Sequence, residues 1–338
     1  MSEQTPENFI VELSPNGGRF ECAPGQTILD AALAAGYWLP HSCRAGSCDT
    51  CHLTLLGGSV QHAAPVAEGT PLPPEGICRT CRASACSNVM LDAPNVPKDP
   101  GQRVVATGAK VVQVDRPSHD VVTVRLQVPA SSGFRFQAGQ YANVIMKDGA
   151  RRHYSMANAP DGDGMIEWHI RRMEGGRFST HAYDKLKAGV MLRIEGPYGT
   201  FLLHPGDAPI VLLASGTGYA PIAALLKTHG AELARRGAVL YWGGRVFADL
   251  YAVESVAAWE ALYPGVRIVP VLSEAGPEWT GRTGFVHAAV LADLPDLSRH
   301  EVYACGNPLM IDAARSSFTS QAGLPADKFF ADAFVINT

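Results

Sequence analysis

The chain has 338 residues, of which 46% are hydrophobic and 18% are charged. This composition indicates a folded globular protein of two or three domains and argues against any long disordered stretch. The net charge of -4 gives no basic field, so neither a nucleic acid nor an anionic membrane surface is expected as a partner. The sequence shows no secretory signal and no apolar run long enough to span a membrane, so we expect a cytoplasmic protein.

The first segment predicts a small mixed sheet crossed by one helix. Residues 9–14 alternate hydrophobic and polar side chains, residues 17–25 have the glycines and prolines of a hairpin, and residues 27–36 predict a helix that Gly36 ends. Residues 93–101 then hold four prolines or glycines without any periodic pattern, which is typical of a stiff linker. We therefore expect a first domain over residues 1–92 and a linker over residues 93–102.

Two further domains are expected after this linker. Between residues 103 and 205, runs rich in β-formers are divided by turn residues, which predicts an antiparallel barrel. Between residues 206 and 338, buried strands alternate with helices, which predicts a parallel, doubly wound α/β sheet. The expected strands of this last domain are 208–215, 238–244, 266–273 and 300–306, and its expected helices are 219–237 and 308–323.

Seven of the eight cysteines lie in the first 86 residues. In a reducing compartment such cysteines favour metal or redox chemistry over disulfides. Cys43, Cys48 and Cys51 have the spacing C-x4-C-x2-C, and 29 residues separate the third of them from Cys81. Four thiolates suit either zinc or an iron–sulfur cluster, and a thiol-only site is the remaining alternative. The other three N-terminal cysteines, which are Cys22, Cys78 and Cys86, are expected to be packed thiols.

The spacing of these four cysteines resembles that of plant-type ferredoxins, in which the thiolates bind a 2Fe-2S cluster. The resemblance covers about ninety residues and implies a β-grasp fold with Cys43, Cys48, Cys51 and Cys81 as metal ligands. The small residues between the first two cysteines allow backbone amides to approach the sulfurs. Asp49 departs from the family, which commonly has glycine there, and the effect of its charge on the cluster potential is left open.

One strand of the expected barrel carries the order R-x-Y-S. Arg152 and Tyr154 point to the same face of this strand, which suits a ligand with a phosphate and a flat ring. Further along, a glycine pair leads into Ser179 and Thr180 at a predicted helix start, where amides and hydroxyls can bind a pyrophosphate. Taken singly, each piece is also compatible with an ordinary barrel strand or a simple capped helix.

Together with the stretch E-G-P-Y-G-T-F, these pieces resemble the FAD-binding domain of the ferredoxin–NADP reductase superfamily. The resemblance implies that Tyr154 packs on the isoalloxazine, that Ser155 hydrogen-bonds near the reactive flavin nitrogen, and that Arg152 meets phosphate. It also implies that the strand with His169 lines the cofactor. The candidate FAD-binding residues are Arg152, Tyr154, Ser155, His169, Ile170, Arg171, Gly175, Gly176, Phe178, Ser179 and Thr180.

The turn G-T-G at residues 216–218 joins a predicted buried strand to a helix. It lacks the strict dinucleotide fingerprint, but its glycines let the backbone approach a pyrophosphate. The later motif C-G-x-P-x-M resembles the nicotinamide site of the same superfamily, which implies that Cys305 lies near the carbon that gives up the hydride; an inert core thiol is the alternative. Arg245 is a candidate phosphate contact. The candidate nicotinamide-nucleotide residues are Gly216, Thr217, Gly218, Pro221, Arg245, Cys305, Gly306, Pro308 and Met310.

The C-terminal stretch F-A-D-A-F resembles the end of oxygenase reductases, where an acid two residues before an aromatic closes over the flavin. Asp332 and Phe334 match this pattern, with four residues following the aromatic. The resemblance therefore adds these two residues to the cofactor-binding set. Ser155, Cys305 and Phe334 are the candidate catalytic residues.

In chain order, the sequence resembles a ferredoxin, an FAD domain and a nicotinamide domain, as in the reductase components of bacterial multicomponent oxygenases for aromatic compounds. This resemblance implies an enzyme that passes electrons from NADH, or NADPH, through FAD and a 2Fe-2S cluster to a terminal oxygenase or its electron carrier. Two alternatives within the fold are a free-flavin reductase and the CDP-6-deoxy-glucoseen type of deoxysugar reductase. A non-catalytic redox-sensing or zinc-binding module is an alternative of another class. The oligomeric state is not predicted.

Overall fold

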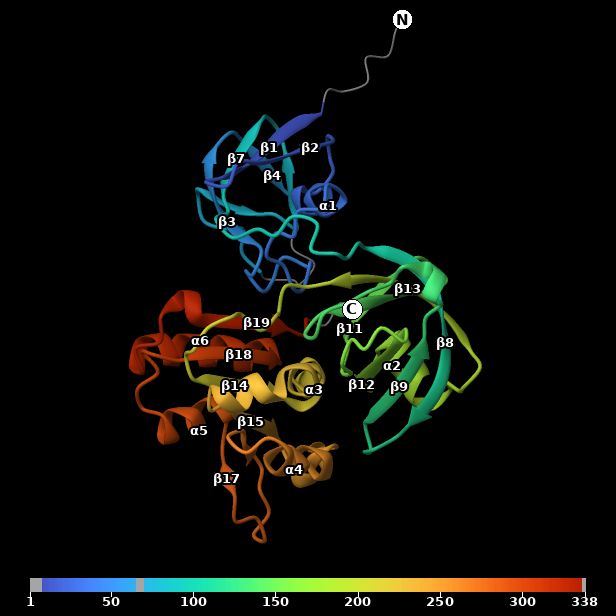
Figure 1. The fold of residues 1–338 in the computed structure, drawn as a ribbon, viewed down its shortest axis with the longest axis vertical. Coiled ribbons are helices and arrows are strands. Elements are labelled where there is room, and N and C mark those ends of the chain that lie inside the picture. The colour runs from blue at the N-terminus through green and yellow to red at the C-terminus, as the bar shows by residue number, and fades with distance from the viewer. Residues whose placement is uncertain (1–7, 65–69, 336–338) are drawn as a thin grey trace, which may run out of the picture. The chain divides into compact units, whose positions relative to one another are not determined.

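The computed structural model describes residues 8–64 and 70–335, which form two compact units (Figure 1). The first unit contains the residues up to Val104 together with Tyr198–Thr200, and the second contains residues 105–197 and 201–334. Both the expected barrel and the expected α/β domain therefore lie in the second unit. Among the helices of the described ranges, none has both the length and the apolar character that crossing a bilayer requires.

The first unit is built on a five-stranded mixed sheet in the order β2-β1-β7-β3-β5. Strand β1 pairs antiparallel with β2 and parallel with β7, and α1 contributes Ile28 and Leu29 to the core beneath the sheet. Thr27 caps this helix by accepting a hydrogen bond from the Asp30 amide. The elements are β1 (Phe9–Ser14), β2 (Gly18–Cys22), α1 (Ile28–Ala34), β3 (His52–Gly57), β4 (Val60–His62), β5 (Ile77–Arg79), β6 (Ala83–Ala85) and β7 (Val89–Asp92).

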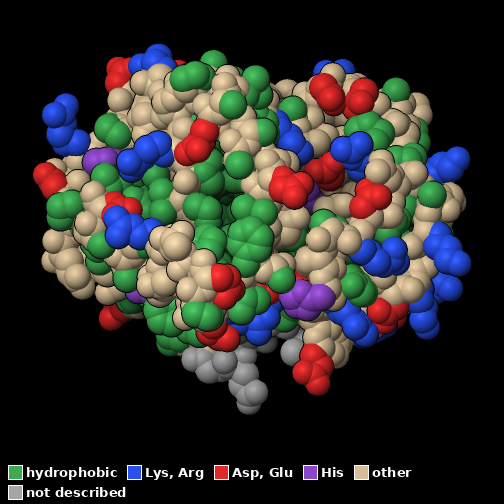
Figure 2. Space-filling model, turned by 90° about the horizontal axis from the view of Figure 1, so that it is seen from below, with side chains coloured by type: hydrophobic (Ala, Val, Ile, Leu, Met, Phe, Trp, Pro, Cys, Tyr) green, Lys and Arg blue, Asp and Glu red, His purple; other side chains and the backbone are tan. Residues whose placement is uncertain are grey.

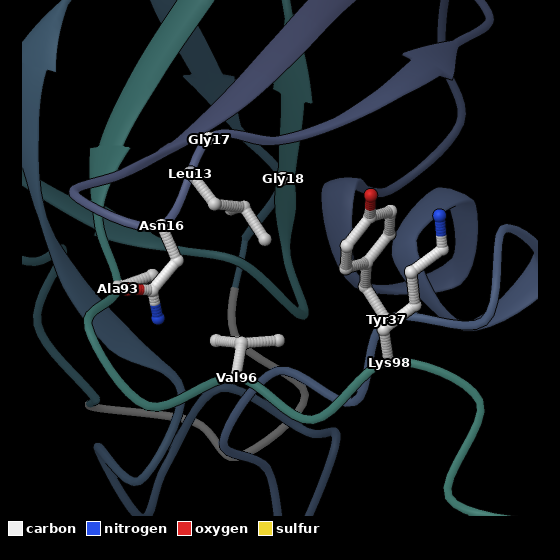
Figure 3. A pocket seen from close by; sticks show the side chains of 8 residues that line it. All are labelled: Leu13, Asn16, Gly17, Gly18, Tyr37, Ala93, Val96 and Lys98. Carbon is white, nitrogen blue, oxygen red and sulfur yellow. The ribbon is translucent and has the colours of Figure 1, made fainter.

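The expected linker packs on the first unit instead of running free. The Trp38 amide donates to the Pro97 carbonyl oxygen at 3.0 Å, and the Asp99 amide donates to the Gly36 carbonyl oxygen at 2.9 Å. Residues of this segment also wall a cavity of about 250 Å³, in which the Lys98 ammonium lies 5.1 Å from the centre of the Tyr37 ring (Figure 3). The proline-rich segment thus hydrogen-bonds to the residues that follow α1. The amino-acid composition of the segment does not predict this contact, because the partners are about sixty residues away in the chain.

The first part of the second unit is a six-stranded sheet in the order β11-β10-β13-β8-β9-β12, as predicted for a barrel. The strand pairs β10–β11, β9–β12, β8–β13 and β8–β9 are antiparallel. A bridge between Met156, directly after β11, and Trp168 of β12 connects the two outer strands of this order. The elements are β8 (Val105–Asp115), β9 (Val121–Gln127), β10 (Tyr141–Ile145), β11 (Arg151–Ser155), β12 (Met165–Arg171), α2 (Arg177–Asp184) and β13 (Met191–Tyr198).

The rest of the second unit is a parallel sheet in the order β17-β16-β15-β14-β18-β19, which confirms the predicted doubly wound arrangement. The chain moves outward from β14 on one side and then returns to β18 on its other side. Helices α4 and α5 and strands β17 and β19 were not predicted. The elements are β14 (Ile210–Ser215), α3 (Tyr219–Arg235), β15 (Val239–Gly244), α4 (Val253–Leu262), β16 (Arg267–Leu272), β17 (Arg282–Thr283), α5 (Val286–Asp293), β18 (Glu301–Gly306), α6 (Pro308–Gln321) and β19 (Phe329–Ala333).

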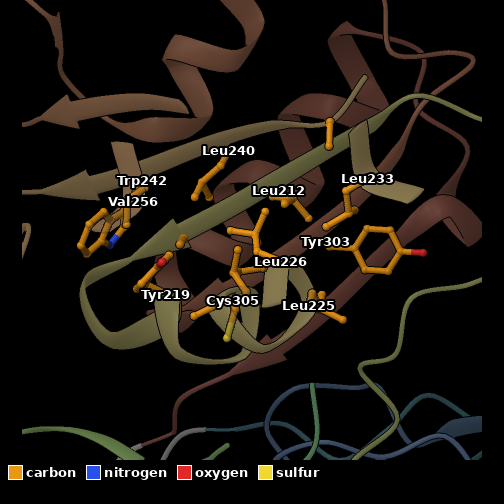
Figure 4. Packing of buried hydrophobic residues seen from close by; sticks show 14 of the residues in the cluster. Leu212, Tyr219, Leu225, Leu226, Leu233, Leu240, Trp242, Val256, Tyr303 and Cys305 are labelled. Atoms are coloured by element: carbon orange, nitrogen blue, oxygen red, sulfur yellow. The ribbon is translucent and has the colours of Figure 1, made fainter. Parts of the chain in front are cut away.

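The core of this sheet contains apolar side chains of the central strands and of α3 (Figure 4). Leu212, Leu240 and Tyr303 come from three neighbouring strands, and Leu225 and Leu226 come from the helix. On the surface face shown in Figure 2, basic and acidic side chains are interspersed, and hydrophobic side chains gather toward the middle. This face therefore carries mixed charge.

Candidate functional site: a four-thiol loop and two cofactor sites

The structure brings the four predicted metal ligands together in the first unit. Cys43, Cys48 and Cys51 lie on the loop between α1 and β3, and Cys81 lies in the turn between β5 and β6. The Sγ atoms of Cys51 and Cys81 are 3.2 Å apart, and the thiol of Cys48 hydrogen-bonds to that of Cys43. The Cys48 and Cys51 thiols are also close enough to interact electrostatically, so the Cys43–Cys48 pair and the Cys51–Cys81 pair are neighbours. Four sulfurs thus face one small volume.

The backbone of this loop is curled so that polar groups point at the sulfurs. Arg44, Gly46 and Asp49 all have positive φ, and the Ala45 amide donates to the Cys43 sulfur at 3.4 Å. The hydrogen bond from Cys48, together with the amides of Ser47 and Ala45, lowers the pKa of Cys43 to about 7, against the effect of burial. These donors stabilise a thiolate, which is the form that binds metal.

The Ser47 hydroxyl provides a direct test of whether the loop fits a cluster. Its Oγ is buried and has no hydrogen-bond partner among the described residues. A buried hydroxyl without a partner is costly unless an acceptor is normally present. A bridging sulfide inside the loop would be such an acceptor, whereas a zinc ion bound by four thiolates would offer none beyond those thiolates. The donor set therefore fits a 2Fe-2S cluster.

Asp49 adopts φ of +58°, a left-handed backbone conformation that favours glycine. Its carboxylate accepts a hydrogen bond from Arg79 Nη2 at 3.3 Å and lies 3.1 Å from His52 Nε2. The Arg79 side chain is only 3% exposed, and it also donates to the Pro71 carbonyl oxygen. Asp49 is therefore an ion-pair partner for a buried guanidinium beside the cysteines.

The remaining cysteines of this unit divide into two classes. Cys22 and Cys78 are fully buried in its core, and burial raises the pKa of each thiol, as expected for packed thiols. Cys86 is exposed, so the expectation that it is packed is wrong. It lies just after the short edge strand β6, where its side chain faces out.

In the barrel, the R-x-Y-S residues lie on β11. The guanidinium of Arg152 has no carboxylate partner within the described ranges, although it is half-buried. Tyr154 packs on Trp168 and Phe178, with ring centres 5.5 Å and 5.6 Å away, and burial raises its pKa. The guanidinium of Arg152 could therefore bind a phosphate of FAD, and the Tyr154 ring could pack on the flat flavin ring.

The helix α2 begins without a side-chain cap. Gly176 occupies the N-cap position, so the first amides of the helix have no side-chain acceptor. A Cβ at Gly176 would lie 2.3 Å from Ser179 Oγ, so a side chain would fill the cradle in front of these amides. The Ser179 hydroxyl instead accepts from the Met173 amide, and Thr180 donates to the Met173 carbonyl oxygen. Of the predicted amides and hydroxyls, the amides therefore lack a side-chain acceptor and fit an anion, whereas the hydroxyls bond to the Met173 backbone.

Strand β12 carries three of the cofactor-binding candidates, whose side chains have different surroundings. Ile170 is fully buried in the barrel core, because it lies on the inner face of the strand. Arg171 forms an ion pair with Asp120, with 2.7 Å between Nε and Oδ2. His169 is turned toward the nicotinamide half of the unit, where Nδ1 lies 2.8 Å from the Tyr251 hydroxyl oxygen.

The glycine turn and the C-G-x-P-x-M motif meet at the carboxyl ends of β14 and β18. A Cβ at Gly218 would lie 2.1 Å from the Cys305 carbonyl oxygen, and one at Gly306 would lie 2.4 Å from Ser215 Oγ. The strand order reverses between these two strands, and in doubly wound sheets ligands bind at this switch point. Thr217 and Pro221 are buried beside the turn, and Pro308 begins α6 with Met310 partly exposed behind it.

The barrel and the parallel sheet meet at this same place. Ser155 Oγ donates to Asp332 Oδ2 at 3.3 Å, and Asp332 is the register partner of Cys305 in the neighbouring strand. Burial and the nearby Asp332 carboxylate raise the pKa of Cys305, which keeps it a neutral thiol. The Phe334 amide donates to the Gly306 carbonyl oxygen at 2.8 Å. The three candidate catalytic residues and Asp332 therefore lie where the ends of β11, β18 and β19 meet.

Arg245 does not offer a free guanidinium. Its Nε lies 3.3 Å from Asp249 Oδ2, and that same oxygen accepts from the Arg245 amide at 2.9 Å. Asp249 is buried, so it holds the loop after β15 in place. This ion pair uses only Nε, and the side chain is 56% exposed, so contact of the two Nη groups with a phosphate stays a prediction.

The comparisons with known proteins agree with this geometry over most of the chain. Residues 11–86 match the 2Fe-2S iron-sulfur cluster binding domain, residues 108–202 the oxidoreductase FAD-binding domain, and residues 212–316 the oxidoreductase NAD-binding domain. The chain is 39% identical over 329 residues to the CDP-6-deoxy-L-threo-D-glycero-4-hexulose-3-dehydrase reductase of Yersinia pseudotuberculosis, with 96% of this chain and 98% of that protein covered. The chain belongs to the family of iron–sulfur flavoprotein reductases.

Two further relatives are reductases by name. Reductase component 2 of the terephthalate 1,2-dioxygenase of Comamonas sp. is 36% identical over 330 residues, with 97% of each chain covered. The crystal structure of the Amycolatopsis cytochrome P450 reductase GcoB is 32% identical with a TM-score of 0.81, and the match covers 98% of this chain and 100% of that one. The reductase is thus an NAD(P)H-dependent oxidoreductase with 2Fe-2S, FAD and NAD-binding domains.

Some residues of the reductase that shape these sites had no signal in the sequence. Ser215 accepts from the Asn307 amide at 3.0 Å and locks the two strand ends, and Trp242 donates to the Gly216 carbonyl oxygen at 3.0 Å. Lys227 and Tyr251 reach the barrel from the parallel sheet. Each acts across a long sequence separation and belongs to no motif.

Proposed function

We propose that the reductase passes electrons from NADH through FAD and the 2Fe-2S cluster to a terminal oxygenase. The observation that carries this proposal is the gathering of four thiols around one volume, with the unpartnered buried hydroxyl of Ser47 on the same loop. The chain also holds a nucleotide site at the switch point of the parallel sheet. Bound FAD takes up a hydride and releases its electrons singly, which lets a one-electron cluster follow a two-electron donor.

The residues are proposed to divide as follows. Cys43, Cys48, Cys51 and Cys81 hold the cluster. Tyr154 and Arg152 bind the ring and a phosphate of FAD, and the free amides at the start of α2 bind its pyrophosphate. The switch-point glycines and Cys305 border the nicotinamide. We propose domain limits of 1–92, 103–205 and 206–338, with the linker between the first two; the matched ranges 11–86, 108–202 and 212–316 fall inside these limits and support them.

An oxygenase acceptor is supported by the full-length likeness to the Comamonas reductase component. A second acceptor, a sugar-nucleotide dehydrase, is supported by the slightly higher identity of 39% to the Yersinia reductase, compared with 36% for the Comamonas protein. A cytoplasmic location is supported by the eight cysteines, all of which lie in the described ranges and are free thiols.

An acceptor-exchange assay tests the proposal. The purified holoprotein is mixed anaerobically with NADH and either a Rieske-type oxygenase or a dehydrase of the deoxyhexulose type, and acceptor reduction is followed. We expect reduction of the oxygenase, and we expect its loss in a Cys48→Ser variant that still oxidises NADH. Reduction of the dehydrase alone would favour the second acceptor, and reduction of free flavin alone would contradict a cluster-mediated function.

A further inference from the structure

Strand β12 presents two polar side chains to the parallel sheet. Glu167 and His169 are two residues apart and therefore share one face of the strand, while Trp168 and Ile170 lie in the barrel core on the other face. The side chains of Glu167 and His169 are 12% and 6% exposed. Buried polar groups of this kind are retained only where hydrogen bonds satisfy them, so their partners define what they do.

The two ring nitrogens of His169 each have one hydrogen-bond partner, and the nature of the partners shows which nitrogen donates and which accepts. Its Nε2 lies 3.1 Å from Glu167 Oε1, and its Nδ1 lies 2.8 Å from the Tyr251 hydroxyl oxygen. Burial lowers the pKa of His169, so the ring is neutral and carries one proton. A carboxylate only accepts, so Nε2 donates to Glu167, and the Tyr251 hydroxyl donates to Nδ1.

Helix α3 supplies a second connection to the same carboxylate. Lys227 Nζ lies 3.2 Å from Glu167 Oε1 and donates to the Ala157 carbonyl oxygen at 2.8 Å. Arg125 binds the other carboxylate oxygen, Oε2, at 2.8 Å. These contacts hold the pKa of Glu167 well below its usual range, although burial alone would raise it. The carboxylate is therefore a permanent anchor on the barrel.

From Tyr251 the contacts continue to the nucleotide turn. Trp242 packs edge-on against Tyr251, with ring centres 5.4 Å apart, and stacks on Tyr219 at 4.6 Å. The Trp242 indole Nε1 donates to the Gly216 carbonyl oxygen at 3.0 Å. Tyr219 is the first residue of α3, which begins directly after Gly218. An unbroken set of close contacts thus connects a barrel strand to both ends of the glycine turn.

We propose that Glu167, His169 and Tyr251 are positioning residues that hold the glycine turn at a fixed distance from the flavin-binding barrel. This inference rests on the proposed assignment of that turn to the nicotinamide nucleotide. In the reaction, the C4–H bond of the reduced nicotinamide breaks and its electron pair passes with the hydrogen to FAD. The three residues would act through their contacts with the glycine turn, which set how closely the two rings approach.

A single hydroxyl deletion tests the proposal in the holoprotein. Tyr251→Phe keeps the ring packing and removes only the hydrogen bond to His169. We expect the limiting rate of flavin reduction by NADH to fall about tenfold, because small errors in placing reacting groups have large effects on rate. The dissociation constant of NADH, the FAD content and reduction by dithionite should stay unchanged. Glu167→Gln should act in the same direction.

The matched control is Tyr241→Phe, which removes a hydroxyl that bonds to Asp293 at 3.2 Å in the same sheet but outside this set of contacts. Anaerobic stopped-flow with NADH deuterated at the transferred position separates binding from the hydride step, and the isotope effect should rise in Tyr251→Phe alone. Equal rates in the two variants would overturn the positioning role. A wild-type protein whose FAD neither NADH nor NADPH reduces would overturn the proposed function and this role with it.

Discussion

Ser155 and Asp332 are 177 residues apart in the chain, yet the serine Oγ donates to the aspartate Oδ2 at 3.3 Å. Both side chains are buried, and they belong to different sheets: Ser155 is the last residue of β11, and Asp332 is the last but one of β19. This contact fixes the end of β11 against the end of β19. Because Cys305 is the register partner of Asp332, the same contact also positions the thiol proposed to border the nicotinamide.

Ser155→Ala is expected to slow flavin reduction by NADH. Loss of a buried hydrogen bond to a charged group is worth about 1.5–3 kcal/mol, which corresponds to about a tenfold or greater loss in rate if the bond is made in the transition state. The measurement is the limiting rate in anaerobic stopped-flow. Ser317→Ala, which removes a buried hydroxyl in α6, is the control and should leave this rate unchanged. Similar rates in both variants would contradict a role for Ser155.

Cys48→Ser is expected to remove one-electron transfer while NADH oxidation through the flavin continues, because the hydride step does not involve the thiols. Iron and acid-labile sulfide content and the visible spectrum report on cluster assembly. Cys86→Ser is a matched substitution at an exposed thiol outside the four-cysteine set, and it should keep a full cluster. Loss of both activities in Cys48→Ser alone would show that the proposed order of transfer is wrong.

Asp49→Asn is expected to raise the cluster potential by about 20–40 mV, since removing about one negative charge near the surface changes the energy of an added electron by up to about 1 kcal/mol. Asn tolerates the positive φ that Asp49 adopts, so the variant changes charge without changing the turn. Asp49→Gly should give the same shift, which separates charge from backbone strain. Spectroelectrochemical titration measures the potential. An unchanged potential would mean that Arg79 already compensates the carboxylate fully.

The ion pair between Arg236 and Glu301 predicts a pH-dependent stability. The side chains are 0% and 3% exposed, with 2.7 Å between Nη2 and Oε2. Hydrogen bonds from Arg236 and Lys328 lower the pKa of Glu301 from its ordinary value of 4.5, against the effect of burial. A depressed folded-state pKa stabilises the protein above pH 4.5, and this contribution is lost as the pH falls through the folded-state pKa.

Glu301→Gln should therefore destabilise the fold at pH 7 by about 3 kcal/mol, because it leaves the buried arginine without its charge partner. The difference from wild type should shrink as the pH is lowered below 4.5, where the wild-type carboxyl also becomes neutral. Urea unfolding at several pH values measures the difference in the free energy of unfolding between the variant and wild type. Glu232→Gln, at an exposed ion pair with Arg235, is the control and should show little effect at any pH. A difference that does not vary with pH would rule out this linkage.

Local patterns predicted much of this fold and site. The cysteine spacing and the turn residues of the barrel depend on short-range chemistry, so the four-thiol loop and both later sheets were predictable. Helices α4 and α5 were not, because their apolar residues form no clear stripe. The buried side chain of Ile170 and the partners of His169 depend on which face of β12 meets the parallel sheet. Contacts with Lys227 and Tyr251 determine which face of β12 meets the parallel sheet, and both residues are distant from β12 in the sequence.

The close approach of Gly218 to the Cys305 carbonyl oxygen limits how coenzyme preference can be engineered. The obstacle to a larger residue at position 218 is main chain, so no second substitution can make room for it. Libraries that seek a switch between the two coenzymes should therefore leave residues 216–218 and Gly306 untouched. Diversity belongs instead at residues 245–248 of the loop after β15, which are exposed.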